Sequence, residues 1–187
     1  MSTRGQIGFI QNGKRLGTYV HHDAFPEELG RLVVEFVAKR LKTVGGQEQF
    51  RSALAEVTWI EDEMAHVDAD SVARYGWDGI CSWYGVLRQF QGAVGLHAIA
   101  DGNLRHLIDD SDFISAWDCE YAYVLDLDRG VLEFWEGNQN EPTFGNPLGE
   151  SPDDFGLYPC AKVGEVAFQE ATVDRLFQAY RISPVSV

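Results

Sequence analysis

The chain has 187 residues, 45% of them hydrophobic and 12% aromatic, which is enough to bury a full core in one domain spanning residues 1–187. It contains no apolar run of about 18 residues and no basic-then-apolar leader, so we expect no membrane span, no secretion and a cytoplasmic location. The formal net charge of −14 is uneven, because residues 52–187 carry twenty-four Asp and Glu against seven Lys and Arg, and such a field repels nucleic acid and anionic lipid.

The first thirty residues predict a hairpin followed by a helix. Apolar runs at 7–10 and 18–20 flank Asn12-Gly13, a pair that favours a tight turn between two antiparallel strands. The second strand would carry His21, His22 and Asp23 to the start of the helix. We expect the Asp23 side chain to cap that helix by accepting backbone N–H bonds.

Two amphipathic helices are predicted next, over residues 26–43 and 47–57. In the first, Leu29, Val33 and Phe36 recur at helical spacing, with acidic residues in the first turn and basic residues in the last. Gly45-Gly46 ends this helix, and the same periodicity resumes after it. The two helices are expected to pack against each other through their apolar faces.

The middle of the chain gives weaker signals. Residues 57–60 are β-branched and aromatic, which favours a strand. Residues 75–86 mix aromatic residues with glycines and predict a turn-rich packed segment. Short helices are expected around 87–90 and 104–108.

The last third predicts a second hairpin and a final helix. Residues 120–136 alternate with period two on both sides of Asp128-Arg129-Gly130, which indicates two antiparallel strands. Residues 137–159 form a long proline-containing loop that either packs as an ordered excursion or is mobile. A helix is expected at 172–181. The predicted fold class is therefore α+β, an antiparallel sheet built from the two hairpins and packed against the three amphipathic helices.

Several separated blocks carry a family resemblance. They are Thr3-Arg4-Gly5, the segment Tyr19-x-His21-x-Asp23-x-x-Pro26-x-x-Leu29-Gly30 and residues 120–137. Together they resemble an uncharacterised family of small proteins that begin with a Thr-Arg-Gly motif and occur in bacteria, phages and fungi. Phe25 and His22 depart from that pattern, which more often has Tyr at the first position and Trp or Phe at the second. The resemblance implies kinship and no established activity.

The leading functional hypothesis rests on the acidic part of the chain. An acidic surface accelerates association with a basic one, and its carboxylates can stand in for phosphates. We therefore expect a protein-binding inhibitor, of the anti-defence or antitoxin and immunity type, that docks on the basic, nucleic-acid-binding surface of a partner as a nucleic-acid mimic. The carboxylates expected to bind the partner are Glu61, Asp62, Glu63, Asp68, Asp70, Asp109, Asp110 and Asp112.

A second hypothesis makes the protein an enzyme. Removal of Met1 would leave Ser2 with a free α-amine, the arrangement of N-terminal-nucleophile amide hydrolases. The catalytic residues would then be Ser2, Arg4, His21 and Asp23. The composition favours the non-enzymatic reading, so no catalytic residue is expected under the leading hypothesis.

A third hypothesis is a structural subunit of a larger assembly, which a large exposed apolar patch would favour. The sequence predicts that the tryptophans Trp77, Trp83, Trp117 and Trp135 lie mainly in the core. Alternatively, one or two of them anchor an interface.

No metal or cofactor is expected. His21, His22 and Asp23 could in principle join His66, His97 or His106, but adjacent histidines on a strand point to opposite faces. The cysteines Cys81, Cys119 and Cys160 form no C-x-x-C pair and are expected to be reduced and buried. No glycine pattern matches a phosphate-binding loop, and basic and aromatic residues are not interleaved, so direct nucleic-acid binding is not expected.

Overall fold

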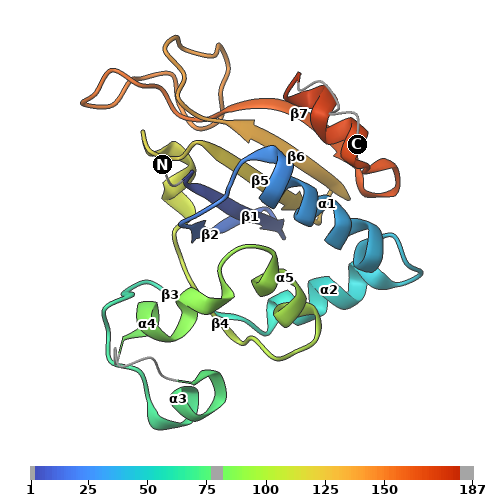
Figure 1. Cartoon of the computed structure of the whole chain (residues 1–187), viewed down its shortest axis with the longest axis vertical. Coiled ribbons are helices and arrows are strands. Elements are labelled where there is room, and N and C mark those ends of the chain that lie inside the picture. The colour runs from blue at the N-terminus through green and yellow to red at the C-terminus, as the bar shows by residue number, and fades with distance from the viewer. Residues whose placement is uncertain (1–2, 77–81, 182–187) are drawn as a thin grey trace.

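The computed structural model describes residues 3–76 and 82–181 and has an α+β fold, which confirms the predicted class (Figure 1). A five-stranded sheet in the order β2-β1-β5-β6-β7 lies at its centre. A smaller sheet pairs two short strands, β3 and β4. The strands are β1 (Gly5–Gln11), β2 (Lys14–Val20), β3 (Thr58–Ile60), β4 (His106–Ile108), β5 (Tyr121–Asp126), β6 (Val131–Glu136) and β7 (Ala161–Ala167).

The main sheet is mixed, which corrects the expectation of a wholly antiparallel one. Both predicted hairpins form: β1 pairs antiparallel with β2, and β5 with β6. The two hairpins join through β1 and β5, which run parallel, with Gly5 opposite Tyr121 and Ile10 opposite Asp126. A long connection separates these strands in sequence, and such a crossover allows parallel pairing. Strand β7, which the sequence did not predict, completes the sheet beside β6.

The first turn is explained by its two residues. Asn12 and Gly13 both adopt positive φ, 54° and 72°. A two-residue hairpin loop of this kind needs left-handed conformations at both positions, which Asn and Gly adopt with little strain. The Asp128 carboxylate accepts hydrogen bonds from both of their backbone N–H groups, at 2.9 and 2.8 Å, and so ties this turn to the β5–β6 turn.

The three predicted helices are present with small changes of boundary. The first is a continuous helical stretch from Pro26 to Leu41 with wider π-helical turns at both ends, and the other two are α2 and α6. Thr172 caps α6 by accepting a hydrogen bond from the Arg175 N–H at 3.3 Å. The helical elements up to residue 60 and after 160 are η1 (Pro26–Gly30), α1 (Arg31–Phe36), η2 (Val37–Leu41), α2 (Gly46–Ala55), η5 (Phe168–Glu170) and α6 (Val173–Ala179).

The expected cap at Asp23 is wrong. The residue before the helix is Phe25, and no side chain caps this end. Asp23 instead has a positive φ of 55°, and its backbone oxygen accepts the Leu29 N–H at 3.2 Å. The chain turns sharply before Pro26, so the Asp23 side chain is left at the surface.

The middle of the chain holds more helices than the sequence indicated. These elements are α3 (Ala69–Tyr75), α4 (Trp83–Leu87), η3 (Arg88–Phe90), α5 (Ala93–Ala100) and η4 (Ser111–Ser115). The short helix expected around 87–90 is confirmed as η3, directly after α4. Helix α5 is almost wholly apolar, so it has no amphipathic period to detect. The short helix expected at 104–108 is wrong, because His106–Ile108 is strand β4, which pairs in parallel with β3. The predicted 57–60 strand is confirmed as β3.

The two faces of the main sheet are covered differently. Tyr123, Leu125 and Phe134 face the larger apolar core, to which the helices contribute. Helices α1, α2, α5 and α6 gather on this side (Figure 1). The alternate residues Val124 and Trp135 pack in a smaller cluster, which includes Ile114, Cys119 and Cys160.

Residues 137–160 form an excursion from the sheet that packs back on the rest of the chain. The Tyr158 N–H donates to the Gln139 oxygen at 3.0 Å, which closes the base of the excursion. Asn146 donates to the Cys160 oxygen at 3.0 Å, and Leu148 packs on the smaller cluster. Figure 1 shows this segment reaching away from α1, α2 and α5.

Candidate functional site

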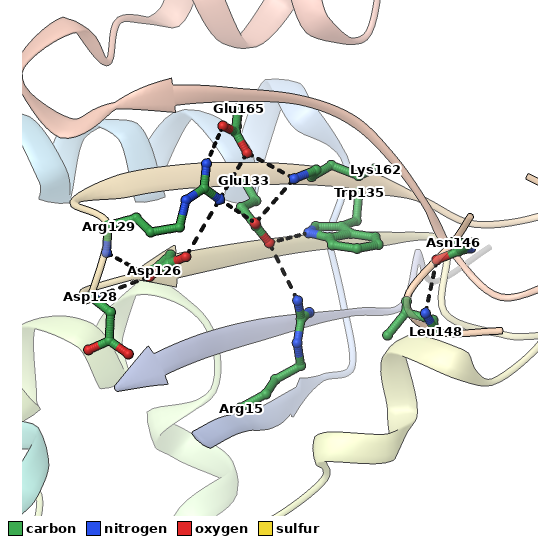
Figure 2. Close-up of polar contacts among 10 residues, drawn as sticks. All are labelled: Arg15, Asp126, Asp128, Arg129, Glu133, Trp135, Asn146, Leu148, Lys162 and Glu165. Atoms are coloured by element: carbon green, nitrogen blue, oxygen red, sulfur yellow. Dashed lines mark hydrogen bonds and ion pairs between the residues drawn. The ribbon is translucent and has the colours of Figure 1, made fainter. Parts of the chain in front are cut away.

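The sheet face opposite the helices carries a network of charged side chains centred on Glu133 (Figure 2). Glu133 lies on β6, and its side chain is only 4% exposed. One carboxylate oxygen accepts the Trp135 indole N–H at 3.0 Å and pairs with Arg15 at 3.5 Å. The other receives Arg129 and Lys162, each at 3.4 Å. One buried carboxylate therefore gathers three cations from three strand or turn segments.

The outer part of this network is an exposed ion-pair cluster. Both Arg129 Nη atoms donate to Glu165, at 3.2 and 2.5 Å, and Lys162 donates to the same carboxylate at 2.8 Å. The hydrogen bonds from Arg129 and then Lys162 lower the pKa of Glu165 to about 2. The hydrogen bond to Glu165 in turn raises the pKa of both Arg129 and Lys162.

Arg15 completes the network from β2. Its guanidinium carbon lies 5.0 Å from the centre of the Trp135 ring. Its Nη1 atom is buried and has no hydrogen-bond partner among the described residues, so the face of the indole ring is its electrostatic partner. Asp126, 3% exposed, accepts the backbone N–H groups of Asp128 and Arg129 at 3.1 and 3.0 Å. The cations and carboxylates of this network pair with one another, so we interpret the network as structural.

An acidic groove lies beside this network at the edge of the sheet. We define it by Lys14, Arg15 and Leu16 on one side and Glu61, Asp109, Asp110, Ser111, Asp112, Phe113 and Ala116 on the other. Its volume is about 670 Å³. Four carboxylates face two cations, and Arg15 is already engaged with Glu133, so the groove is electronegative. It brings together four of the eight carboxylates expected to bind a partner.

Two of the groove carboxylates, Asp109 and Asp110, stabilise the fold. The outer edge of β2 is closed by residues 109–111: Asp110 accepts the Tyr19 N–H at 3.0 Å and donates its own N–H to the Gly17 oxygen at 2.8 Å. Ser111 accepts the Gly17 N–H at 3.1 Å, and its hydroxyl donates to Asp109. Burial raises the pKa of Asp110, the Tyr19 hydrogen bond opposes this, and the nearby Glu63 and Asp109 carboxylates raise it further. Asp110 is thus a structural residue of the sheet edge.

The remaining predicted carboxylates are divided between structure and solvent. Asp68 caps α3, with the Ser71 N–H and hydroxyl each donating to it at 2.8 Å, and these hydrogen bonds lower its pKa. Asp62 accepts the Met64 N–H at 3.0 Å. Glu63 and Asp70 are exposed, Glu63 near Asp110 and Asp70 in the first turn of α3. Of the eight, Glu61, Glu63, Asp70 and Asp112 have side chains that accept no hydrogen bond and form no ion pair within the described residues, so they are free to meet a partner.

The residues proposed for hydrolysis are only partly described. Ser2 lies outside the described residues, so that hypothesis stays a prediction. The Ala24 N–H donates to the Thr3 oxygen at 3.1 Å, which brings the opening of the chain beside the 21–24 segment. Arg4 is paired with Asp118 at 2.5 Å. His21 Nδ1 lies 2.6 Å from the Tyr19 hydroxyl, and burial, then the charges of His22 and Arg4, lower the pKa of His21.

The histidines and cysteines are dispersed. His97 packs on Phe36, His106 lies 2.9 Å from the Tyr75 hydroxyl, and His66 bridges to Ser82. Within residues 3–76 and 82–181, no three His, Cys, Asp or Glu side chains are placed to hold a metal ion. Cys119 and Cys160 are free and buried side by side, with the Cys160 thiol 3.4 Å from the Cys119 oxygen. Cys81 lies outside the described residues.

Trp117 and Phe155 form an exposed aromatic pair. Trp117 was expected mainly in the core but is 44% exposed; Phe155 is 70% exposed, and the two ring centres lie 4.8 Å apart. Trp117 follows Ala116, which lines the groove. Trp83 and Trp135 are buried as expected, and Trp77 lies outside the described residues. One signal of the charged network is present in the sequence: Glu133 stands between apolar residues in the middle of β6.

Comparison with protein-family models, with curated proteins and with solved structures gave no match to this chain. The resemblance to proteins that begin with a Thr-Arg-Gly motif therefore stays a prediction. Among the described residues, each helix is too short or too polar to cross a membrane.

Proposed function

We propose that the protein is an acidic inhibitor that docks on a basic, nucleic-acid-binding surface of a partner protein. The observation that carries the proposal is the acidic groove, where Glu61 and Asp112 stand free beside the edge strand β2. Electrostatic complementarity of this kind speeds association and selects a basic partner. The carboxylates would occupy positions that phosphates occupy on the partner, as in antidotes to toxins and in anti-defence proteins. The proposal places this encounter in the cytoplasm.

The groove also offers an anchor. The Trp117–Phe155 pair is an exposed aromatic surface that begins one residue after Ala116 of the groove lining, and arginine side chains stack on such rings while pairing with acids. Tryptophan is among the residues that most often contribute binding energy at protein interfaces. The partner surface that fits best is therefore rich in arginine.

The test compares two double charge reversals. In the first, Glu61 and Asp112 become lysine; in the second, the control, Glu141 and Glu170 become lysine. All four residues are exposed, so both variants change the net charge equally. Each protein is immobilised and exposed to an extract of the cells it comes from, at about 0.1 M and 0.5 M salt.

The proposal expects retention of a nucleic-acid-binding protein by the wild-type chain and by the control. The groove variant should lose it, added nucleic acid should compete, and binding should weaken with salt. Equal retention by the two variants, or retention indifferent to nucleic acid, would contradict the proposal.

The exposed aromatic residues favour a second candidate, a structural subunit. Besides Trp117 and Phe155, Phe144 is 96% exposed. Apolar rings at a surface are also typical of assembly interfaces. Sedimentation of the wild type and of a Trp117→Ser, Phe155→Ser variant tests this candidate: a concentration-dependent oligomer that the variant abolishes would support it, and a monomer in both would exclude self-assembly through these rings.

A further inference from the structure

A second cavity lies at the far end of β2, away from the acidic groove. It is formed by the residues just after β2, by the start of the first helix and by the start of α5, with a volume of about 330 Å³. This volume is at the lower end of the range of about 300–1,000 Å³ seen for small-molecule sites. Much of the wall comes from the 19–30 segment, which the sequence predicts to connect the first hairpin to the first helix.

The floor and one side of this cavity are apolar. Val20 and Leu29 are each 4% exposed and form the base. Leu32 and Val94 lie higher and remain 37% and 59% exposed, two of the larger apolar side chains left open on the surface. Gly92, with φ of 71°, lets the chain pass close to Leu29 without a side chain in between. The base can therefore receive a hydrocarbon group and remove it from water.

The mouth of the cavity is acidic. Asp23 and Glu28 line it, and neither carboxylate accepts a hydrogen bond or forms an ion pair with another residue in the described part of the chain. His22 is the basic residue of the cavity wall, and no Lys or Arg lines it. Two unpaired carboxylates beside a low-dielectric floor favour a positive charge in the mouth.

We propose that this cavity binds a small organic cation with an apolar body, of the arylalkylammonium or alkylammonium class. The hydrocarbon lies on Leu29, Leu32 and Val94, and the ammonium group pairs with Asp23 and Glu28. An ammonium has three donors, which matches two carboxylates better than a neutral hydroxyl does. The proposal does not depend on the acidic groove, because the two sites share no lining residue.

Phenethylammonium is the probe, followed by shifts of backbone amide signals in nuclear magnetic resonance at low salt, about 20 mM. 2-Phenylethanol and 3-phenylpropionate serve as neutral and anionic probes of similar shape. The variants are Asp23→Asn, which keeps a residue that tolerates the left-handed conformation, and Glu28→Gln. The matched control is Glu27→Gln, because Glu27 is an exposed acid beside Glu28 that does not line the cavity.

We expect the ammonium probe to bind with a dissociation constant on the order of 1 mM and to shift the Gly92 and Val94 signals. Asp23→Asn and Glu28→Gln should each weaken binding about two- to fivefold, and together about tenfold. The Glu27 control should bind as the wild type does, and the propionate should bind most weakly.

Three results would overturn the proposal. They are equal binding of 2-phenylethanol and phenethylammonium, unchanged affinity in the double variant, and shifts that map to the acidic groove in place of the 20–32 and 91–94 segments. Amide spectra of each variant report its fold directly, and the single substitutions lie at exposed positions, so a loss of binding is read on a folded protein.

Discussion

Replacement of Glu133 with alanine is expected to destabilise the protein by about 3 kcal/mol. The Glu133 side chain is 4% exposed and lies within 3.5 Å of a donor on each of Trp135, Arg129, Lys162 and Arg15. Removing one partner of a buried pair usually costs about 3–5 kcal/mol, because the other charges stay behind unpaired. The three cations are 27–50% exposed and regain some hydration, which puts the value at the lower end. Glu133→Gln keeps an acceptor for the indole, so about 1–2 kcal/mol is expected for it.

Urea unfolding followed by tryptophan fluorescence and circular dichroism measures these free energies. The control is Glu165→Ala, expected to cost about 1 kcal/mol because this carboxylate is 35% exposed and screened by solvent. In a chain of 187 residues, about 3 kcal/mol corresponds to a Tm lower by about 6–12 °C.

The salt dependence of the free energy of unfolding distinguishes the Glu133 and Glu165 substitutions further. At about 1 M salt the Debye length falls to about 3 Å, so the cost of losing Glu165 should shrink while that of losing Glu133 persists. If Glu133→Ala destabilises no more than Glu165→Ala at either salt concentration, the network is not organised on the buried carboxylate and the reasoning is refuted.

Three further outcomes follow from the same physics. Since the folded-state pKa of Glu165 is about 2, below its usual 4.5, its stabilising effect is present above about pH 4.5 and lost as the pH falls toward 2; Glu165→Gln should therefore flatten the acid limb of stability against pH. Asp68→Ala should speed amide hydrogen exchange in α3 more than Asp70→Ala does, because only Asp68 caps the helix, and equal effects would argue against the cap. The neighbouring Cys160 thiol and burial hold the pKa of Cys119 well above its usual range, so mapped alkylation at pH 8 should label Cys119 and Cys160 only after unfolding; rapid labelling of the native protein would show that the smaller cluster opens.

The hairpins and the helices at 26–43, 47–57 and 172–181 were predictable because their signals are local. A turn pair such as Asn12-Gly13, or an apolar period, acts within a few residues. The parallel join of β1 to β5 was not, because nothing near either strand specifies the partner that it meets after a hundred residues of chain. Helix α5 was missed for a different reason: apolar residues occupy its exposed side as well as its buried side, Val94 among them, so its sequence carries no contrast between faces.

For the candidate site, the sequence predicted which acidic residues take part but not what each of them does. The sequence located the carboxylates, but their roles depend on which backbone N–H groups lie unpaired nearby. Asp110 meets the open edge of β2 and Asp68 meets the start of α3, so both are used by the fold. Glu61 and Asp112 meet neither and stay free in the groove. No pattern within the sequence distinguishes these two pairs, because the deciding groups come from distant segments.

The state of the sheet edges also limits how a partner can bind. An exposed edge strand offers unpaired N–H and C=O groups to a strand of another protein. On β2 this route is blocked, since Gly17 and Tyr19 already bond to Ser111 and Asp110. Both cavities are lined in part by β2, one at each end of the strand. They offer side chains to a ligand, because the backbone groups of this edge are already hydrogen-bonded. Recognition at either end of β2 must therefore act through side-chain charge and apolar contact, which makes salt concentration and single-residue substitution the right probes of both sites.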